Sequence, residues 1–157
     1  MSIKFVVFTT CTLALFSGAE AFAAGSTANA IFNGQVADTC ILAAGNAGTL
    51  ASSADFTKLA STNAGGSQST VNATATSNAY SIKTVAPSNF TTGDSSNVAF
   101  STSYSLTGTT SAYQVPGTQG TKLNPGNSVV AVDLNAAKSS GTFPAGAYAA
   151  AVTVRCE

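Results

Sequence analysis

Two cysteines carry the clearest chemistry in this sequence. Cys40 and Cys156 are the only cysteines outside the apolar N-terminal segment. Two thiols in an exported chain most often form a structural disulfide, and here the bridge would close a loop of about 116 residues. Loop-closure entropy gives such a bridge a stabilising effect of roughly 4–5 kcal/mol. A metal site would need more ligands, and a redox pair would need spacing such as Cys-x-x-Cys, so we predict a structural Cys40–Cys156 disulfide.

The residue types that usually carry catalysis are scarce. The chain has no His and no Trp. No Ser stands at Ser-x-x-Lys spacing, and neither a Gly-rich phosphate loop nor an Asp-x-Asp-x-Asp calcium loop occurs. We therefore predict no catalytic residue, no metal site and no cofactor.

The carboxylates leave one enzymatic alternative. A glycosidase would require two of them to meet in a pocket. We expect instead that Asp94 lies in a solvated turn and that Asp133 lies on the polar face of a strand. The five carboxylates after residue 23 are Asp38, Asp55, Asp94, Asp133 and Glu157.

The charge balance argues against two classes of partner. Six acidic residues offset six basic ones, so the net charge is zero. Nucleic acids and anionic lipids both require a basic face, which this composition does not provide. Low net charge promotes association, and this suits a protein in an assembly or at a cell surface.

The N-terminus has the pattern of a secretory signal peptide over residues 1–23. Lys4 precedes an apolar run over residues 5–16, and Ala21-Phe22-Ala23 provides a cleavage site. The run is shorter than the ~20 residues that a membrane-spanning helix needs, and no later segment is longer. We predict no transmembrane segment, one secreted domain over residues 24–157, and a location in the periplasm or at the extracellular surface.

Period-two alternation along most of the secreted part indicates β-strands. The clearest run is at the C-terminus, where the even-numbered residues 148–156 are apolar and include Cys156. Similar runs cover 71–75, 80–84, 98–106 and 130–134. Turn signals such as Pro116-Gly117 separate them, so we predict an all-β sandwich or barrel.

Two segments have less regular patterns. The first strand is expected to place Phe32, Val36 and Cys40 on its buried face. Residues 51–60 are expected to form a short helix or a loop, with Phe56 and Leu59 packed inward.

Two aromatic residues near predicted loops are candidate ligand contacts. Phe90 and Tyr113 could stack on a sugar, although carbohydrate sites favour Trp. The other aromatic residues have strand parity and are expected in the core. These two residues are the basis of an alternative function, a small adhesin or carbohydrate-binding domain.

The two ends of the domain resemble those of chaperone–usher pilins. Residues 30–42, Ala-Ile-Phe-Asn-Gly-Gln-Val-Ala-Asp-Thr-Cys-Ile-Leu, resemble the first strand of these pilins. Phe-Pro-Ala-Gly-Ala-Tyr at 143–148, followed by Ala-Val-Thr-Val at 151–154, is similar to their last strand and to that of spore-coat-U-like secreted proteins.

The resemblance implies an incomplete immunoglobulin-like sandwich. In that family a chaperone, and then the N-terminal extension of the next subunit, donates the missing strand to an exposed sheet edge. Residues 24–31 are then expected to be the donor strand, with Ala28, Ala30 and Phe32 as candidate apolar side chains. Edges near Cys40 and the C-terminal strand are expected to accept it.

The resemblance also implies a function and partners. It favours a non-catalytic structural subunit of a surface appendage or coat, which associates with itself or with related subunits and with a periplasmic chaperone. Two features depart from the pilin pattern: the extension before Phe32 is short, and Cys40 is matched with Cys156 instead of with a cysteine in the next strand. Both features also fit a self-complete binding module that does not polymerise.

Overall fold

The computed structural model describes residues 25–157, so the predicted signal peptide at 1–23 lies outside the described residues. The chain divides into two units, residues 1–34 and residues 35–157. Residues 25–34 of the first unit form neither helix nor strand. The part of the chain that the structure describes contains no helix that is long and apolar enough to cross a membrane.

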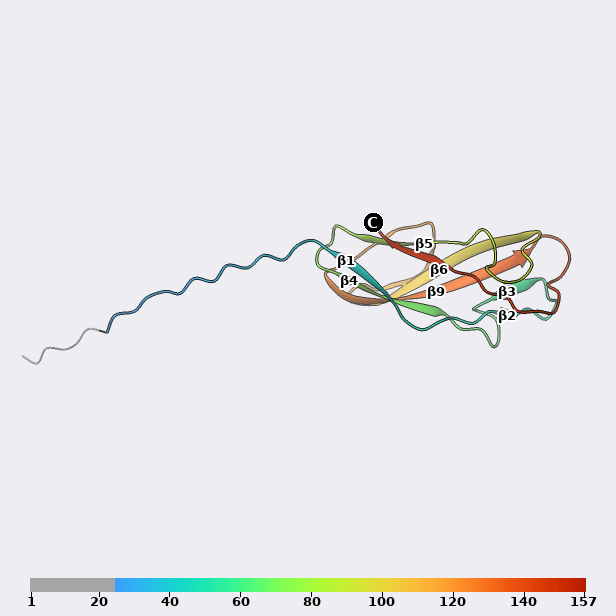
Figure 1. The fold of residues 1–157 in the computed structure, drawn as a ribbon, viewed down its shortest axis with the longest axis horizontal. Helices are drawn as coiled ribbons and strands as arrows, with labels where there is room; N and C mark the ends of the chain where they lie inside the picture. The colour runs from blue at the N-terminus through green and yellow to red at the C-terminus, as the bar shows by residue number, and fades with distance from the viewer. Residues whose placement is uncertain (1–24) are drawn as a thin grey trace, which may run out of the picture. The chain divides into compact units, whose positions relative to one another are not determined.

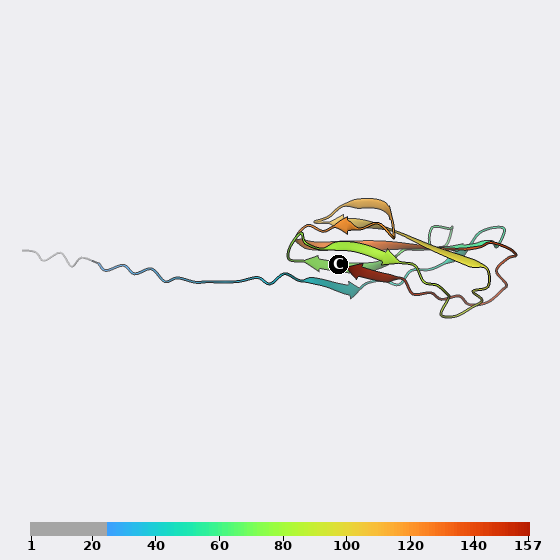
Figure 2. The same ribbon diagram turned by 90° about the horizontal axis from the view of Figure 1, so that it is seen from above.

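The second unit consists of two antiparallel β-sheets, which confirms the all-β prediction (Figures 1 and 2). The larger sheet contains β1 Cys40–Ala44, β2 Ala51–Ser52, β3 Lys58–Ala60, β4 Ser69–Ala75, β6 Val98–Gly108, β7 Ala112–Pro116 and β9 Gly126–Lys138. The smaller sheet contains β5 Ser81–Val85, β8 Thr121–Lys122 and β10 Thr153–Cys156. Strand β9 is central, because it pairs with β6 over its length and also with β4 and β3.

The core lies on the faces that the alternation predicted. Strand β9 buries its even-numbered residues from Ser128 to Ala136, and β6 buries Tyr104 and Leu106. Tyr104 and Ile82 are fully buried, and they bring β6 and β5 of different sheets into one core cluster. Along the C-terminal segment the even-numbered residues are half-buried and the odd-numbered ones are exposed.

The predicted disulfide is confirmed. Cys40 and Cys156 are bonded, with their Cα atoms 6.4 Å apart. The bridge joins the first strand, β1, to the last strand, β10, and each of these belongs to a different sheet.

The first strand is shorter than predicted. It begins at Cys40, whereas Phe32 and Val36 are 92% and 80% exposed. Strand β4, the only described neighbour of β1, ends at Ala75 opposite Cys40. The backbone before Thr39 therefore has no neighbouring strand with which to form β-sheet hydrogen bonds.

The prediction of a short helix or a loop over residues 51–60 holds only for residues 53–57, which form a loop. Residues 51–60 as a whole form a hairpin of β2 and β3 around a tight turn. Leu59 is buried as expected, but Phe56 is 55% exposed. Its φ of 56° lies in the left-handed region, which suits a turn and not a helix.

Asp133 is not on a solvated strand face as the sequence predicted. It is buried, and its two carboxylate oxygens accept hydrogen bonds from Ser61 Oγ at 2.7 Å and from Gln68 Nε2 at 2.6 Å. The segment between β3 and β4 supplies both donors and covers this part of the outer face of β9. The polar residue is therefore buried with its partners, as buried polar groups require.

Candidate functional site

A groove of about 480 Å³ opens between the larger sheet and the segment that leads into β10. Its walls are residues 47–50, which follow β1, and residues 148–152 with Val154. Its floor is formed by Val71, Val132 and Leu134, which belong to the inner face of the larger sheet. No described residue that lines the groove carries a charge. The lining is uncharged and mixes apolar residues with Ser and Thr, and its floor residues Val132 and Leu134 are themselves 4% and 8% exposed.

Strand β10 presents an unpaired edge to this groove. Among the described strands it pairs only with β5. Ser81 and Glu157 exchange both backbone hydrogen bonds, at 2.7 and 2.9 Å. Because bonded and non-bonded pairs alternate in an antiparallel ladder, the odd-numbered residues of β10 bond to β5. Val154 and Cys156 therefore direct their N–H and C=O groups to the opposite side.

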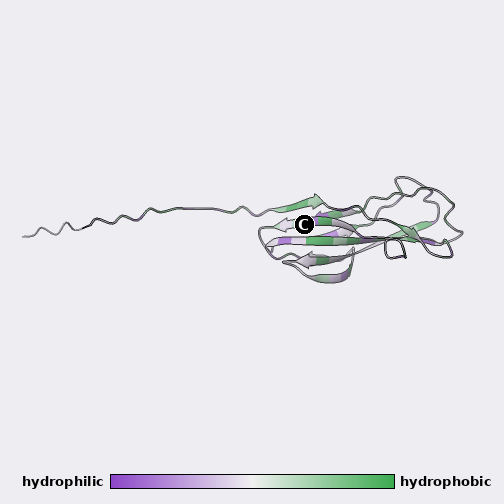
Figure 3. Cartoon of the chain, turned by 90° about the horizontal axis from the view of Figure 1, so that it is seen from below, coloured by the Kyte–Doolittle hydropathy of each residue, from purple (hydrophilic) through white to green (hydrophobic). Residues whose placement is uncertain are grey.

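Strand β1 presents a second unpaired edge. The backbone N–H groups of Thr76 and Gly45 donate to Thr39 O and Thr70 O, at 3.0 and 2.9 Å. By the same alternation, the odd-numbered residues of β1 bond to β4, and Cys40, Leu42 and Ala44 direct their backbone groups away from it. All five residues of β1 are apolar (Figure 3). An apolar strand with a free edge is a template for pairing with another strand.

The disulfide closes one end of the space between these edges. Strands β1 and β10 run in opposite directions beside each other, so the start of β1 meets the end of β10 (Figure 2). Adjacent strands are about 4.8 Å apart, so a strand placed between two others needs roughly twice that separation. The 6.4 Å between the Cα atoms of Cys40 and Cys156 leaves no room for one. The space between β1 and β10 is thus closed at the disulfide, and residues 148–152 and Val154 line the groove on the N-terminal side of Cys156.

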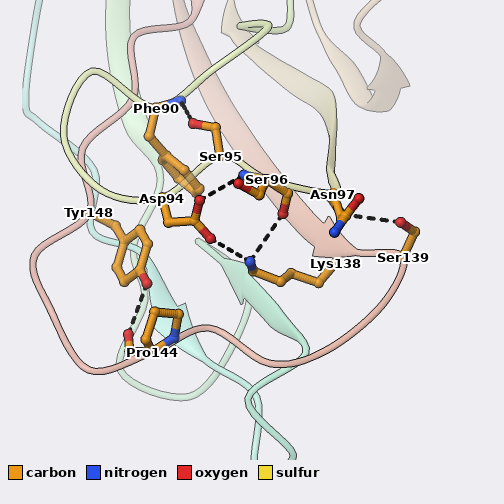
Figure 4. Close-up of polar contacts among 9 residues, drawn as sticks. All are labelled: Phe90, Asp94, Ser95, Ser96, Asn97, Lys138, Ser139, Pro144 and Tyr148. Atoms are coloured by element: carbon orange, nitrogen blue, oxygen red, sulfur yellow. Dashed lines mark hydrogen bonds and ion pairs between the residues drawn. The ribbon is translucent and has the colours of Figure 1, made fainter.

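The other end of the groove has aromatic walls. A second hollow of about 500 Å³ lies beside the first, and the two share Leu50 and Tyr148 in their linings. The phenol of Tyr148 donates to Pro144 O at 2.8 Å (Figure 4). Its ring also contacts Phe90 and Phe143 edge-on, with centroids 5.2 and 5.4 Å away. Tyr148 is therefore held in place from two sides.

An ion pair fixes the loop that supports these rings. Lys138 Nζ lies 2.6 Å from Asp94 Oδ2 and 3.0 Å from Ser96 O (Figure 4). The hydrogen bond from Lys138, aided by one from Ser96, holds the pKa of Asp94 well below its ordinary value. Because the Lys138 side chain is only 7% exposed, this pair pins the loop to the end of β9.

The chain that precedes β1 is anchored at the closed end. Thr76 Oγ1 donates to Ala37 O at 2.9 Å and accepts from Thr39 N at 2.7 Å. Residues 37–39 therefore continue the line of β1 past Cys40, away from the groove. They are held in that direction by the residue that follows β4.

The residues predicted from the sequence have different positions. Cys40 and Cys156 form the disulfide that joins β1 to β10, and neither residue lines the groove. Ala28, Ala30 and Phe32 are exposed residues of the first unit. Phe90 is 7% exposed and packs in the aromatic core, whereas Tyr113 on β7 is 83% exposed.

The groove itself was missed in the sequence. Its floor is made of core residues that alternation alone assigns to a closed interior. One signal was present: the alternation over residues 148–156 is longer than β10, which spans only Thr153–Cys156. Residues 148–152 therefore alternate like a strand but are not paired with a neighbouring strand along their length.

Metal binding has no support in the described residues, because among residues 25–157 no three His, Cys, Asp or Glu side chains gather in one place. No protein-family model, curated protein or solved structure matches this chain.

Proposed function

We propose that this chain is a non-catalytic structural subunit of a surface appendage or coat, and that it assembles by β-strand addition. Its fold would be an immunoglobulin-like sandwich that lacks one strand. The observation that carries the proposal is the uncharged groove beside the unpaired edge of β10. A strand placed there would pair with the backbone groups of β10 and pack over the groove floor of Val71, Val132 and Leu134.

The dimensions of the groove suit one short strand. Residues 148–154 form one wall, and at about 3.3 Å per residue seven residues extend roughly 20 Å. The incoming strand needs apolar side chains at every second position to meet the floor. Its backbone would pair with the groups that Val154 and its even-numbered neighbours direct away from β5.

The segment before β1 has the composition of such a strand. Within residues 28–36 the even-numbered residues are apolar or glycine, and the odd-numbered neighbours of Phe32 are Ile31 and Asn33. Phe32 and Val36 are exposed and available for burial. The donor that we propose covers residues 28–36. It therefore begins and ends closer to β1 than the segment 24–31 that was expected from the sequence. The inward set is Ala28, Ala30, Phe32, Gly34 and Val36.

The proposed donor comes from a second copy of the chain. To fill its own groove, the segment would have to reverse direction within residues 37–39. That reversal would break the hydrogen bonds that Thr76 makes to Ala37 and Thr39. A second copy delivers the same strand without this loss, and the product is a linear assembly.

The test is the assembly state of the oxidised protein without residues 1–23, by light scattering and negative-stain microscopy. Phe32→Ser removes the largest inward side chain and should abolish assembly. Ile31→Ser is the matched control, because Ile31 is similarly exposed but has the outward parity. Deletion of residues 24–36 should give a monomer that binds a peptide of residues 28–36. Strand addition would be contradicted if both serine variants assembled equally. It would also be contradicted if the parent protein were monomeric and the deletion variant did not bind the peptide.

One observation favours a second candidate function. Tyr113 is 83% exposed on β7, so its ring is accessible to a ligand as a binding module requires. A small adhesin or carbohydrate-binding domain would remain monomeric and would lose glycan binding in Tyr113→Ser. A glycan array with the parent and this variant tests it, and an array without any Tyr113-dependent signal rejects it.

A further inference from the structure

We propose that Asn33 is a site of spontaneous deamidation in this protein. It is the only asparagine in the chain that is followed by glycine. Asn33 and Gly34 are exposed, and both lie outside any helix or strand. A Cβ at position 34 would meet no atom within 4 Å, so the surroundings of this peptide bond are open. Sequence and structure therefore both leave the side-chain amide of Asn33 accessible to the backbone nitrogen of Gly34.

The reaction needs only these two residues and water. The backbone nitrogen of Gly34 loses its proton and attacks Cγ of Asn33, and a C–N bond forms that closes a five-membered succinimide ring. The Cγ–Nδ2 bond breaks, and ammonia leaves with the released proton. Water then opens the ring at either carbonyl, which gives isoaspartate or aspartate. Glycine favours the attack because it lacks a Cβ and reaches backbone conformations closed to other residues.

Other asparagines in the chain lack this combination. Asn29 and Asn46 are exposed, but alanine follows each of them. Asn127 is followed by Ser128 within β9, and its side-chain oxygen accepts a hydrogen bond from Thr74 Oγ1 at 2.8 Å. A residue in a strand has an extended backbone, which holds the next nitrogen away from Cγ. Asn33 should therefore react first.

The consequence for assembly rests on the proposed function. Isoaspartate adds a methylene to the backbone between Phe32 and Val36, which breaks the period-two spacing of the inward side chains. It also adds a negative charge to the strand, at a position with the outward parity of Ile31. A donor strand already paired in the groove is extended, and so it should be protected. Unassembled subunits would thus lose the ability to donate this strand with time, whereas assembled subunits would keep it.

The test measures deamidation and assembly separately. The oxidised protein without residues 1–23 is incubated at mildly alkaline pH, then reduced, alkylated and digested with trypsin. Asn29, Asn33 and Asn46 fall in one tryptic peptide, so fragmentation compares them directly. Conversion at Asn33 should be about tenfold or more faster than at Asn29, because only Gly34 lacks a Cβ. Gly34→Ala should reduce the rate at Asn33 to that at Asn29.

Two outcomes separate this inference from the proposed function. Equal conversion at Asn33 and Asn29 overturns the deamidation site, whatever the assembly state. Rapid conversion at Asn33 with unchanged assembly of the converted protein retains the site but removes the donor role. Asn33→Asp adds the charge without the methylene, so a smaller loss of assembly in this variant than in the isoaspartate form identifies the backbone insertion as the cause.

Discussion

At the scale of single residues, buried polar groups distinguish this domain from a simple apolar sandwich. Asp133 and Lys138 are almost fully covered, yet each has its partners within hydrogen-bond distance. Both hold a connecting segment against β9. Asp133 binds Ser61 and Gln68 between β3 and β4, and Lys138 binds the loop before β6 through Asp94.

Removing the Asp133 carboxylate should destabilise the fold. Asp133→Ala leaves the donors of Ser61 and Gln68 without an acceptor in a buried site, so the free energy of unfolding should fall by about 1–3 kcal/mol. Urea denaturation followed by circular dichroism measures this. Asp38→Ala removes an exposed carboxylate and is the control. Equal stability of the two variants would contradict the buried role of Asp133.

Stability should also depend on pH through Asp94. Its pKa is lowered in the folded state by the hydrogen bond from Lys138, so its contribution is present above the unfolded value of about 3.9. That contribution is lost as the pH falls through the lower folded value. In Lys138→Met the pKa of Asp94 should rise, and stability should fall less steeply in acid.

Carboxyl carbon NMR titration of both proteins measures these pKa values. Asp55 is the internal control, because hydrogen bonds from Ser53 and Thr57 lower its pKa to about 2 without Lys138. A titration of Asp94 that is the same with and without Lys138 would contradict the assignment.

At the scale of strands, the sequence predicted most of the residues that form β-strands, but it did not predict where every strand begins and ends. Alternation identified the inward faces of β5, β6 and β9, because burial on one face forces a period of two. It failed at Phe32 and Val36, which alternate in the same way but have no neighbouring strand. Periodicity describes the strand itself and carries no information about whether a partner is present.

The same limit explains the groove and the short hairpin. Val132 and Leu134 alternate like closed-core residues, and only the tertiary arrangement shows that they line an opening. Strands β2 and β3 have two and three residues, which is too short for a period to be read. The burial of Asp133 depends on a loop that crosses over it and could not be predicted from its own strand.

A hydroxyl group links the two sheets at the level of β6. Tyr104 Oη lies 2.9 Å from the carbonyl oxygens of Ile82 and Gln119, and 2.7 Å from Thr121 Oγ1. Tyr104→Phe should therefore lower the free energy of unfolding by about 1–2 kcal/mol, because the buried carbonyl group of Ile82 loses this hydrogen-bond partner. Tyr113→Phe is the matched control on an exposed ring. An equal effect of both changes on the denaturation midpoint would contradict this link.

At the scale of residues 35–157, the two β-sheets are joined differently on their two sides. On the β5–β6 side, Gly117 bridges the sheets, since its oxygen accepts from Thr84 N at 3.0 Å and its nitrogen donates to Thr102 O at 2.8 Å. On the β1–β10 side the disulfide joins the edges at one end. The fold is thus closed along one side and open along the other, where we propose that a strand is added.

The disulfide should carry much of the stability of a domain that is open along this side. The bridge connects residues 116 apart, so its loss frees a long loop in the unfolded chain. Cys40→Ala/Cys156→Ala should lower the free energy of unfolding by about 2–5 kcal/mol. Denaturation of the oxidised protein, the reduced protein and the double variant measures this, and the last two should agree. The bridge also closes one end of the space between β1 and β10. The double variant should therefore bind the peptide of residues 28–36 in more than one register, detectable as several disulfide crosslinks to engineered cysteines along residues 148–154. A reduced protein as stable as the oxidised one would show that other contacts hold β1 to β10.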